Sequence, residues 1–386
     1  MVKRCLRLIF GRVSRQRGPL QKRAAASWAP VGFCSLCQHG VALSADALHT
    51  ARLNEFQALG TNGHSFTGGP YFASPAPSKL EDMRPSVRLV AIDIDGTLLP
   101  TFSQVISARN ARALKAAQDS GIVVAIATGR RTAYTAPLLE GLGLRADTPL
   151  ITSNGAVTRT LSGDPVDRSQ LEARVARGVC GLLRKFGAMV FTFDKIGRGE
   201  LVVEDLEQAH ERIALWVEAN RGAIEVVKPL ENALVDGEDP IQGMVAGGLS
   251  QMKKAEKALK ASVWGVSCEC VRTEYPGRDL SILDLLPPGV SKGWALERLA
   301  GRLGIDRKET MAIGDNWNDV DMLEWAGQGV LMGNAAAELR AMATTRGWRL
   351  TQPNDDDGVA VVLETAVTQW GQVNGRKKHW ASTARS

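Results

Sequence analysis

Two carboxylates stand close together at the end of an apolar run near residue 90. Asp93 and Asp95 are separated by one residue, follow the run that begins at Val87, and precede Gly96. In a strand, residues i and i+2 point to the same face, so both carboxylates would face the same way. Burying like charges side by side is costly unless a cation compensates them, and Mg²⁺ prefers such oxygen ligands. A helix cap plus a turn would explain only one of the two carboxylates, so we expect a metal site here.

Three later segments place further ligand-type residues after apolar runs or at a helix start. They are Thr128-Gly129-Arg130, Ser291-Lys292-Gly293 and Gly314-Asp315-Asn316-Trp317-Asn318-Asp319. The first presents a hydroxyl and backbone N–H groups to an anion. The second opens a helix with a cation that could neutralise phosphate, and the third adds two carboxylates that could complete the metal site. Each segment alone is a common pattern, and only their combination indicates phosphate chemistry.

The elements that must position these residues alternate between strand and helix, which is the pattern of a parallel α/β sheet. We expect strands at 87–95, 122–127, 149–152 and 310–314, and helices that begin at Ser107 and Thr132. Open sheets of this class bind ligands beyond the carboxyl ends of their strands, where the carboxylates and Thr128 lie. The sequence therefore predicts an α/β fold with a Rossmann-like parallel-sheet core domain.

The middle of the chain has a different rhythm and indicates an inserted domain. We expect helices at 171–186, 206–220 and 250–261, and strands at 189–193, 200–203, 224–227, 241–245, 263–272 and 280–285. Short strands separated by turns favour a smaller, mostly antiparallel sheet with helices on one face. The expected division is a core domain at 87–168 and 287–374 and an α+β cap domain at 169–286.

In their order along the chain, the four segments resemble the four motifs of the haloacid dehalogenase-like (HAD) phosphohydrolases. Asp93-x-Asp95-Gly96-Thr97 is similar to the first motif, Thr128 to the second, Lys292 to the third, and Gly314-Asp315-x-x-Asn318-Asp319 to the fourth. Ser153-Asn154-Gly155-Ala156 and the segment 354–360 resemble the Cof-type branch. The insertion lies between the second and third motifs, where the resemblance implies a C2B-type cap of subfamily IIB, which includes sugar-phosphate phosphatases.

The resemblance implies a Mg²⁺-dependent phosphatase of a small phosphorylated metabolite, either a sugar phosphate or a cofactor phosphate. Asp93 would be the nucleophile that forms an aspartyl-phosphate, and Asp95 the general acid and base, which also offers the metal a backbone carbonyl. The phosphoryl oxygens would be held by Thr128, Gly129, Lys292 and Asn318. The metal would be held by Asp93, Asp95, Asp315 and Asp319, the last as an outer residue or through water.

Substrate choice and other functions stay open at this stage. Specificity would depend on cap side chains, for which Arg198, Glu274 and Arg278 are candidates. A phosphotransferase or phosphomutase would pass the aspartyl-phosphate to another acceptor, although this cap type favours hydrolysis. A non-catalytic scaffold would bind RNA or an acidic partner through basic tails, but the tails show little of the aromatic interleaving that nucleic-acid binding uses, so no nucleic acid is expected.

The basic residues are concentrated at the two ends of the chain. Eight of the 47 Lys and Arg residues lie in 1–45, which contains no acid, and four lie in a basic tail at 375–386. The remaining 35 face all 41 Asp and Glu residues, so the body is net acidic although the whole chain carries +6. Residues 1–85 suggest an organelle transit peptide or, as we favour, a disordered extension or a misplaced start.

Several classes of protein are excluded or disfavoured. No apolar run approaches the ~20 residues of a membrane-spanning helix, so we expect no membrane and a cytoplasmic location, with an organelle as the alternative if 1–85 contains a transit peptide. Six cysteines are too few for a disulfide scaffold in 386 residues. Cys34 and Cys37 have the spacing of half a zinc site, but no second ligand pair follows, which favours an inert pair. The oligomeric state is left open.

Overall fold

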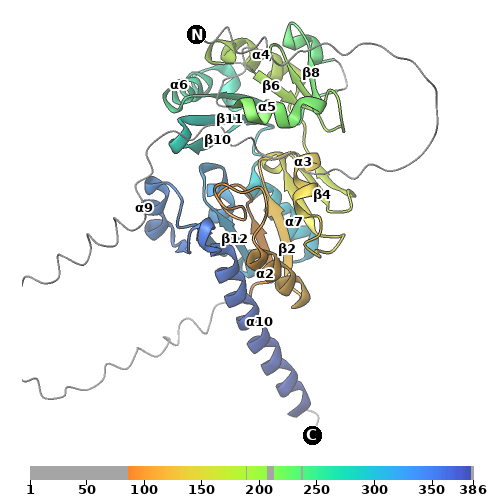
Figure 1. Cartoon of the computed structure of the whole chain (residues 1–386), viewed down its shortest axis with the longest axis vertical. Coiled ribbons are helices and arrows are strands. Elements are labelled where there is room, and N and C mark those ends of the chain that lie inside the picture. Colours follow the sequence, from red (N-terminus) through yellow and green to blue (C-terminus); the bar gives the residue numbers. More distant parts are fainter. Residues whose placement is uncertain (1–85, 188, 207–212, 236–237, 384–386) are drawn as a thin grey trace, which may run out of the picture. The chain divides into compact units, whose positions relative to one another are not determined.

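The computed structural model describes residues 86–187, 189–206, 213–235 and 238–383. The N-terminal extension at 1–85, and with it the Cys34 and Cys37 pair, therefore lies outside the described residues. Two sheets organise the described chain, each with helices packed on it (Figure 1). Among the described residues, no helix combines the length and the apolar character needed to cross a lipid bilayer.

The larger sheet belongs to the core domain and has eight strands in the order β14-β13-β12-β1-β2-β3-β4-β5. All neighbours run parallel except β4 and β5, which are added antiparallel at one edge. The strands are β1 (Leu89–Ile92), β2 (Val123–Ala127), β3 (Pro149–Thr152), β4 (Val157–Thr160), β5 (Pro165–Arg168), β12 (Thr310–Gly314), β13 (Gln328–Leu331) and β14 (Arg349–Leu350). This sheet confirms the parallel α/β core that the sequence predicts.

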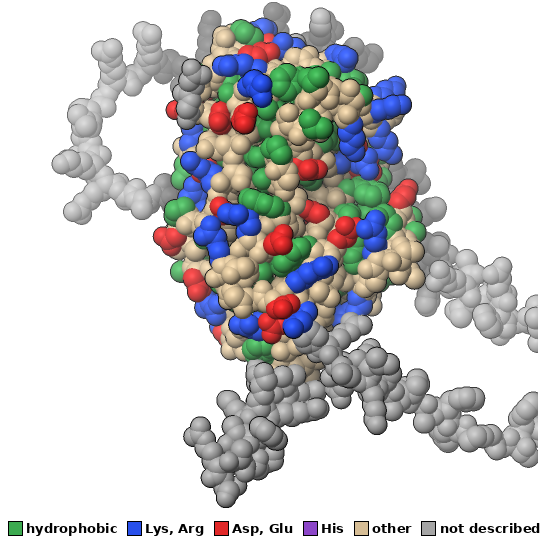
Figure 2. Space-filling model, turned by 180° about the vertical axis from the view of Figure 1, so that it is seen from behind, with side chains coloured by type: hydrophobic (Ala, Val, Ile, Leu, Met, Phe, Trp, Pro, Cys, Tyr) green, Lys and Arg blue, Asp and Glu red, His purple; other side chains and the backbone are tan. Residues whose placement is uncertain are grey.

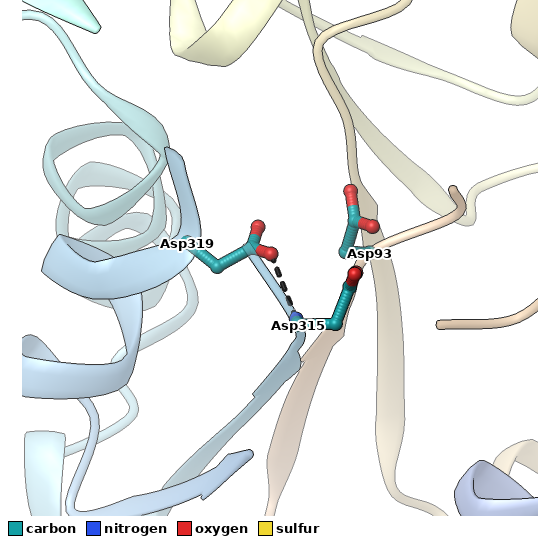
Figure 3. A group of neighbouring side chains, drawn as sticks. All are labelled: Asp93, Asp315 and Asp319. Carbon is teal, nitrogen blue, oxygen red and sulfur yellow. Dashed lines mark hydrogen bonds between the residues drawn. The ribbon is translucent and has the colours of Figure 1, made fainter. Parts of the chain in front are cut away.

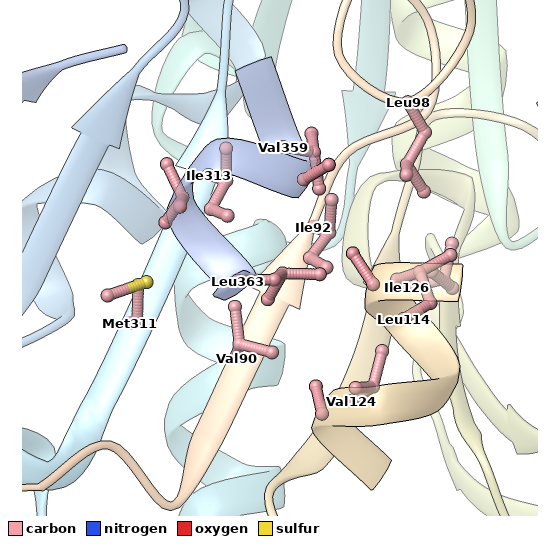
Figure 4. Close-up of a cluster of buried hydrophobic side chains, with 14 of the residues drawn as sticks. Val90, Ile92, Leu98, Leu114, Val124, Ile126, Met311, Ile313, Val359 and Leu363 are labelled. Atoms are coloured by element: carbon pink, nitrogen blue, oxygen red, sulfur yellow. The ribbon is translucent and has the colours of Figure 1, made fainter. Parts of the chain in front are cut away.

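Helices cover both faces of the core sheet because its strands are apolar on both sides. In β1, Val90 and Ile92 pack on one face and Leu89 and Ala91 on the other, and all four are fully buried. The first face is covered by α2 (Ala108–Asp119), α3 (Thr132–Leu139) and α10 (Gly358–Thr383), part of which Figure 4 shows. The second is covered by α7 (Lys292–Leu303), α8 (Val320–Trp325) and α9 (Ala337–Arg346). Each large aliphatic side chain buried here contributes about 1.5–3 kcal/mol, so β1 is held firmly on both sides.

Two helix boundaries of the core follow from local chemistry. Ser107 precedes α2 and accepts a hydrogen bond from the backbone N–H of Asn110, as the sequence predicts for a capping serine. The Ser107 hydroxyl also donates to Asp357, just before α10, so the starts of the two helices are tied together. Helix α10 continues past residue 374, the predicted end of the core domain, into the segment predicted as the basic tail.

The smaller sheet forms the inserted cap domain, which lies between β5 and α7 in the chain. Its strand order is β10-β11-β9-β6-β7-β8, and every pair is antiparallel except β7 with β8. The strands are β6 (Met189–Thr192), β7 (Leu201–Val203), β8 (Ile224–Val226), β9 (Gln242–Gly247), β10 (Glu269–Tyr275) and β11 (Leu280–Leu286). The mostly antiparallel cap sheet agrees with the sequence prediction.

The cap helices lie on both faces of this sheet, so the prediction of helices on one face only is wrong. Helices α4 (Ala173–Leu183) and α6 (Leu249–Lys260) pack on the face that carries Phe191. Helix α5 (Ala214–Asn220) packs on the opposite face, against Val190. Adjacent strand residues alternate between faces, and both faces of β6 are apolar, so each can bind a helix.

Two element boundaries in the cap also differ from the prediction. The strand expected at 263–272 begins only at Glu269, because Val263–Val266 forms a 3-10 turn. Ser262 caps this turn by accepting a hydrogen bond from the backbone N–H of Trp264, a local bond that competes with strand pairing. Of the helix expected at 206–220, the structure shows α5 from Ala214 onward, while residues 207–212 are not described.

Candidate active site

The predicted site residues of the core emerge at the carboxyl ends of three adjacent strands. Strand β1 is paired in register with β12 on one side and with β2 on the other, all parallel. Asp93 follows β1, Thr128 follows β2 and Asp315 follows β12. Because parallel strands end at the same edge of the sheet, these three residues lie side by side.

Asp93, Asp315 and Asp319 form a buried acidic cluster (Figure 3). Each offers a carboxylate oxygen, and these oxygens all lie within 4.8 Å of one another. Asp319 ends the 3-10 turn after β12, and its Oδ2 accepts hydrogen bonds from the backbone N–H groups of Asp315 at 2.9 Å and Asn316 at 3.0 Å. The structure thus brings together the side chains of three of the four predicted metal ligands.

Lys292 is the cation of this cluster and is completely buried. Its Nζ donates to Asp93 Oδ1 and to Asp319 Oδ1, both at 2.6 Å. Lys292 opens α7, whose start is held by the Ser291 cap. The absence of a side chain at Gly155 lets the start of α7 approach closely, since a Cβ at residue 155 would collide with the backbone carbonyl of Ser291. The lysine predicted to bind phosphate therefore lies between Asp93 and the fourth motif.

The cluster is short of positive charge. Burial raises the pKa of Asp93 to about 7, although Lys292 opposes the shift, and burial raises the pKa of Asp315 well above its ordinary value. For Lys292, burial alone would lower the pKa, but the carboxylates of Asp319 and Asp93 outweigh it and hold the ammonium charged. One cation thus serves three buried carboxylates, and a second cation would relieve the imbalance.

The first motif and the fourth are in direct contact. Thr97 Oγ1 donates to Asp315 Oδ1 at 2.9 Å, which orients the carboxylate. Gly96 has a φ of 82° and sits against the same carboxylate, where a Cβ would collide with the oxygens of Asp315. Glycine is required at this position for both its backbone conformation and its lack of a side chain.

The side chain of Asp95 lies apart from the acidic cluster and pairs with an arginine of the second motif. Arg130 donates from Nε to Asp95 Oδ2 at 2.7 Å and from Nη2 to Asp95 Oδ1 at 2.5 Å, in a bidentate pair. The other terminal nitrogen of Arg130, Nη1, is buried and has no hydrogen-bond partner among the residues that the structure describes. Thr128 is buried beside them, and its Oγ1 accepts from the backbone N–H of Arg130 at 3.2 Å. The second motif therefore holds the predicted general acid as well as offering donors to an anion.

A chain of side-chain hydrogen bonds connects the fourth motif to the cap. Asn318 donates to Asn154 Oδ1 at 3.0 Å, and Asn154 donates to Asp284 Oδ2 at 2.8 Å. Gln242 donates to the other oxygen of Asp284. In the sequence, Asn154 is marked only as part of the segment 153–156, which resembles the Cof-type branch. Asp284 and Gln242 were not predicted, because no local pattern marks them.

A cavity of about 350 Å³ lies above these residues, between the core strand ends and the cap sheet. Its floor includes Asp93, Asp95 and Asn318, and its cap wall includes Met244 and Asp284. Of the three cap residues proposed from the sequence to set specificity, Arg278 lines the cavity, whereas Arg198 and Glu274 are not among its lining residues.

Contacts between core and cap surround this cavity. The Asn316 side chain accepts from the backbone N–H of Glu274 at 3.0 Å and donates to its carbonyl at 2.8 Å. The guanidinium of Arg272 lies 5.1 Å from the ring of Trp317, so this bulky residue of the fourth motif has a partner in the cap. On another side, Arg131 donates to Glu200 and to Asn220, in the cap. The fourth-motif turn and α3 thus both contact the cap.

Charge is distributed more evenly on the outer surface than in the buried cluster. On the face drawn in Figure 2, basic and acidic side chains of the described residues are interspersed over much of the surface.

Comparison with known proteins identifies related chains. A family model described as haloacid dehalogenase-like hydrolase matches residues 90–363, a span that contains every predicted site residue. The phosphatase YwpJ of Bacillus subtilis is 32% identical over 295 residues, covering 72% of this chain and 99% of YwpJ. The 5-amino-6-(5-phospho-D-ribitylamino)uracil phosphatase YwtE of the same organism is 29% identical over 295 residues, covering 72% and 97%.

Solved structures show the same fold. A haloacid dehalogenase-like hydrolase from Bacteroides thetaiotaomicron matches with a TM-score of 0.58 and 26% identity, covering 72% of this chain and 99% of that one. A structure described as a subclass IIB sugar phosphatase matches in fold with a TM-score of 0.58 at 24% identity, covering 72% and 98%. These likenesses agree with the core-plus-cap architecture.

Proposed function

The chain belongs to the haloacid dehalogenase-like hydrolases, and from this premise we propose that it is a Cof-type, subclass IIB phosphatase, which removes phosphate from a small phosphorylated metabolite through an aspartyl-phosphate on Asp93. The observation that carries the proposal is the buried cluster of Asp93, Asp315 and Asp319 around Lys292, beside the cavity. Hydrolysis of a phosphate ester needs a nucleophile, a cation that offsets charge and a site sheltered from water. The cluster and the cavity beside it support all three.

The acidic cluster fits a Mg²⁺ ion. Its donors are hard carboxylate oxygens, and their raised pKa values show that one lysine does not balance their charge. Asp93 and Asp315 are the ligands that we assign to the ion, with the backbone carbonyl of Asp95, while both oxygens of Asp319 already accept hydrogen bonds and give it an outer place. When bound, Mg²⁺ would offset the charge of the phosphoryl group so that an anionic nucleophile can approach.

The two half-reactions use Asp93 and Asp95. A carboxylate oxygen of Asp93 bonds to phosphorus while the bond from phosphorus to the leaving-group oxygen breaks, and Asp95 gives that oxygen a proton. Water then attacks phosphorus, Asp95 takes its proton, and the bond between phosphorus and Asp93 breaks to release inorganic phosphate. Arg130 donates to both oxygens of Asp95 and so holds the orientation of its carboxyl group.

Other residues of the core would hold the phosphoryl oxygens. Lys292 supplies a charge, Thr128 a hydroxyl and Gly129 a backbone N–H, with Asn318 at the edge of the cavity. Their donors surround the nucleophile, so charge that develops on the phosphoryl group is stabilised from several directions. The cap wall faces this group and limits the access of bulk water.

The size of the cavity and the relatives support the class of substrate. A volume of about 350 Å³ accommodates a metabolite rather than a macromolecule. The substrate in the name of YwtE is a ribitylaminouracil phosphate, which is a small phosphorylated metabolite. Sugar phosphates and cofactor-related phosphates are therefore the two kinds of ester to compare.

One assay tests the proposed mechanism directly. Hydrolysis of p-nitrophenyl phosphate is measured with and without Mg²⁺ for the wild type and for Asp93→Asn, which keeps the size of the side chain but is a poor nucleophile. We expect turnover that requires Mg²⁺ and a loss of at least about a thousandfold in the variant. Asp119→Asn is the matched control, because Asp119 is an exposed residue of α2 that pairs with Lys115 on the surface.

The alternatives predict other results. Metal-independent turnover, or full activity of Asp93→Asn, would refute the mechanism. A phosphotransferase would release p-nitrophenol without an equal amount of inorganic phosphate when an alcohol acceptor is added, so both products are measured.

A further inference from the structure

One buried carboxylate of the cap has no part in the proposed mechanism. Asp284, on β11, lines the cavity and is only 5% exposed. It lies on the same face of the cap sheet as Met244 of β9 and Ile282 of β11, which are also cavity-lining residues. Burying a carboxylate among aliphatic side chains costs free energy, so the presence of one here needs an explanation.

The structure holds this carboxylate in one orientation. Gln242 donates to its Oδ1 and Asn154 donates to its Oδ2 at 2.8 Å. Even with these two donors, burial raises the pKa of Asp284 to about 7. A carboxylate can accept about four hydrogen bonds, so two amide donors leave acceptor capacity for a ligand in the cavity.

Hydrogen bonds link Asp284 to the loops proposed to bind phosphate, and so fix where the two ends of a substrate would bind relative to each other. Asn154 has a φ of 51°, and its side-chain amide bridges Asp284 in the cap and Asn318 in the fourth motif. A Cβ at Gly129 would lie 3.1 Å from Asn154 Oδ1, so this amide lies directly beside the second motif. The acceptor in the cap is therefore positioned relative to the groups that bind phosphate.

Much of the rest of the wall is apolar. Leu201, Met244 and Ile282 line it, together with the aromatic residues Trp216 and Tyr275, while Thr273 and Arg278 add polar groups. A plain sugar would turn some of its hydroxyl groups toward the apolar side chains and leave them without partners, at a cost in free energy. A planar ring would place its faces on the apolar part of the wall and its polar edge at Asp284.

We propose that Asp284 is a specificity-determining residue, which accepts hydrogen bonds from N–H or O–H groups on the leaving group, and that the preferred substrates are phosphate esters whose leaving group contains a planar heterocycle, aromatic or of the nucleobase type, with such donors. This inference rests on the proposed phosphohydrolase function and names the substrate class of the same site. Gln242 and Asn154 act as positioning residues, since they hold the carboxylate in place.

The test compares two sets of phosphate esters on the wild-type enzyme. The ring-bearing set, whose leaving groups contain a planar heterocycle, is uridine 5′-monophosphate, thiamine monophosphate and pyridoxamine 5′-phosphate. The set called ring-free here, whose leaving groups contain no planar ring, is ribose 5-phosphate, glucose 6-phosphate and glycerol 3-phosphate. We expect the best ring-bearing ester to exceed the best ring-free ester at least tenfold in kcat/KM. A ring-free ester with the highest kcat/KM would overturn the proposed class.

The variant Asp284→Asn isolates the role of the carboxylate. We expect the ratio of kcat/KM for the best ring-bearing ester to kcat/KM for p-nitrophenyl phosphate, which has no N–H or O–H donor on its leaving group, to fall by about 10- to 100-fold. Glu269→Gln, the same acid-to-amide change at an exposed position of β10, is the matched control and should keep the wild-type ratio. An equal loss for both esters in Asp284→Asn would show a structural role and would refute recognition by Asp284.

A binding measurement removes any dependence on turnover. The dephosphorylated form of the best ring-bearing ester is used as an inhibitor of p-nitrophenyl phosphate hydrolysis, and we expect its Ki to rise at least tenfold in Asp284→Asn, with an unchanged Ki arguing against the proposal. A thermal melt verifies that the variant is folded. Absence of any p-nitrophenyl phosphate hydrolysis in the wild type would instead contradict the proposed function itself, so the two failures are distinguishable.

Discussion

The floor of the cavity, taken together with the buried acidic cluster beside it, differs from the cap wall in how its residues are spaced along the chain. In the cluster, Asp315 and Asp319 are four residues apart and joined by a hydrogen bond within one turn. On the wall, Asp284 is bonded to Gln242 across 42 positions and to Asn154 across 130. A single loop can therefore build most of a catalytic motif, whereas the recognition wall exists only when two sheets face each other.

The two regions also differ in charge. The floor gathers three buried carboxylates and one lysine, as expected for a site that binds the phosphate common to all substrates. The wall carries one buried carboxylate among apolar side chains, as expected for a site that binds a variable leaving group. Changes on the floor should thus affect all phosphate esters alike, and changes on the wall should alter their ranking.

Replacing the lysine of the floor should have the largest effect. Lys292→Met leaves Asp93 and Asp319 buried without their cation. We expect kcat/KM to fall at least about a thousandfold for every ester and the free energy of unfolding to fall by about 3–5 kcal/mol. Enzyme assays and urea unfolding measure the two effects, with the exposed Lys115→Met as control. A variant that lost activity on some esters only would break the distinction between floor and wall.

The carboxylate of the wall should give stability a pH dependence of its own. Burial raises the pKa of Asp284 from 3.8 to about 7, so between these pH values the unfolded chain is ionised while the folded protein keeps the proton. Rising pH therefore favours unfolding across this window, by up to about 4 kcal/mol from this residue. In Asp284→Asn that contribution is lost, so its stability should fall less between pH 4 and pH 7.

The measurement is urea unfolding at several pH values for both proteins. Burial also raises the pKa of Asp93 to about 7, but Asp93 is present in both proteins, and its contribution cancels in the difference. Parallel pH profiles would mean that Asp284 is already ionised in the folded protein at low pH.

Metal binding should distinguish variants of the floor from variants of the wall, with a smaller effect than the changes described above. Added Mg²⁺ should raise the melting temperature of the wild type, since a ligand present at a hundred times its Kd stabilises the folded state by about 2.7 kcal/mol. Asp315→Asn should lose this shift, because it removes a charged oxygen of the cluster that Thr97 orients. Asp284→Asn, on the wall, should retain it. Loss of the shift in the wall variant would show that the two regions are not independent.

Much of the floor could be predicted from the sequence because its signals are local. Asp93, Thr128 and Asp315 each end an apolar run, and parallel strands must end at one edge of the sheet. The insertion between the second and third motifs was also visible, since its strands are short and separated by turns. The bidentate pair of Arg130 with Asp95 was not predictable, because the two residues are 35 positions apart and no pattern in the sequence relates their side chains.

The sequence by itself determined the reacting groups, their order and the strands that end beside them, because periodicity and motif spacing act over a few residues. Tertiary structure alone decided which cap face meets the site. Helix α5 and the cavity share one face of the cap sheet while α4 and α6 cover the other, a choice that depends on the packing of both faces. The cavity wall and the bonds of Asp284 follow from that packing, since the bond from Gln242 forms only when β9 and β11 pair, and the bond from Asn154 only when core and cap are in place.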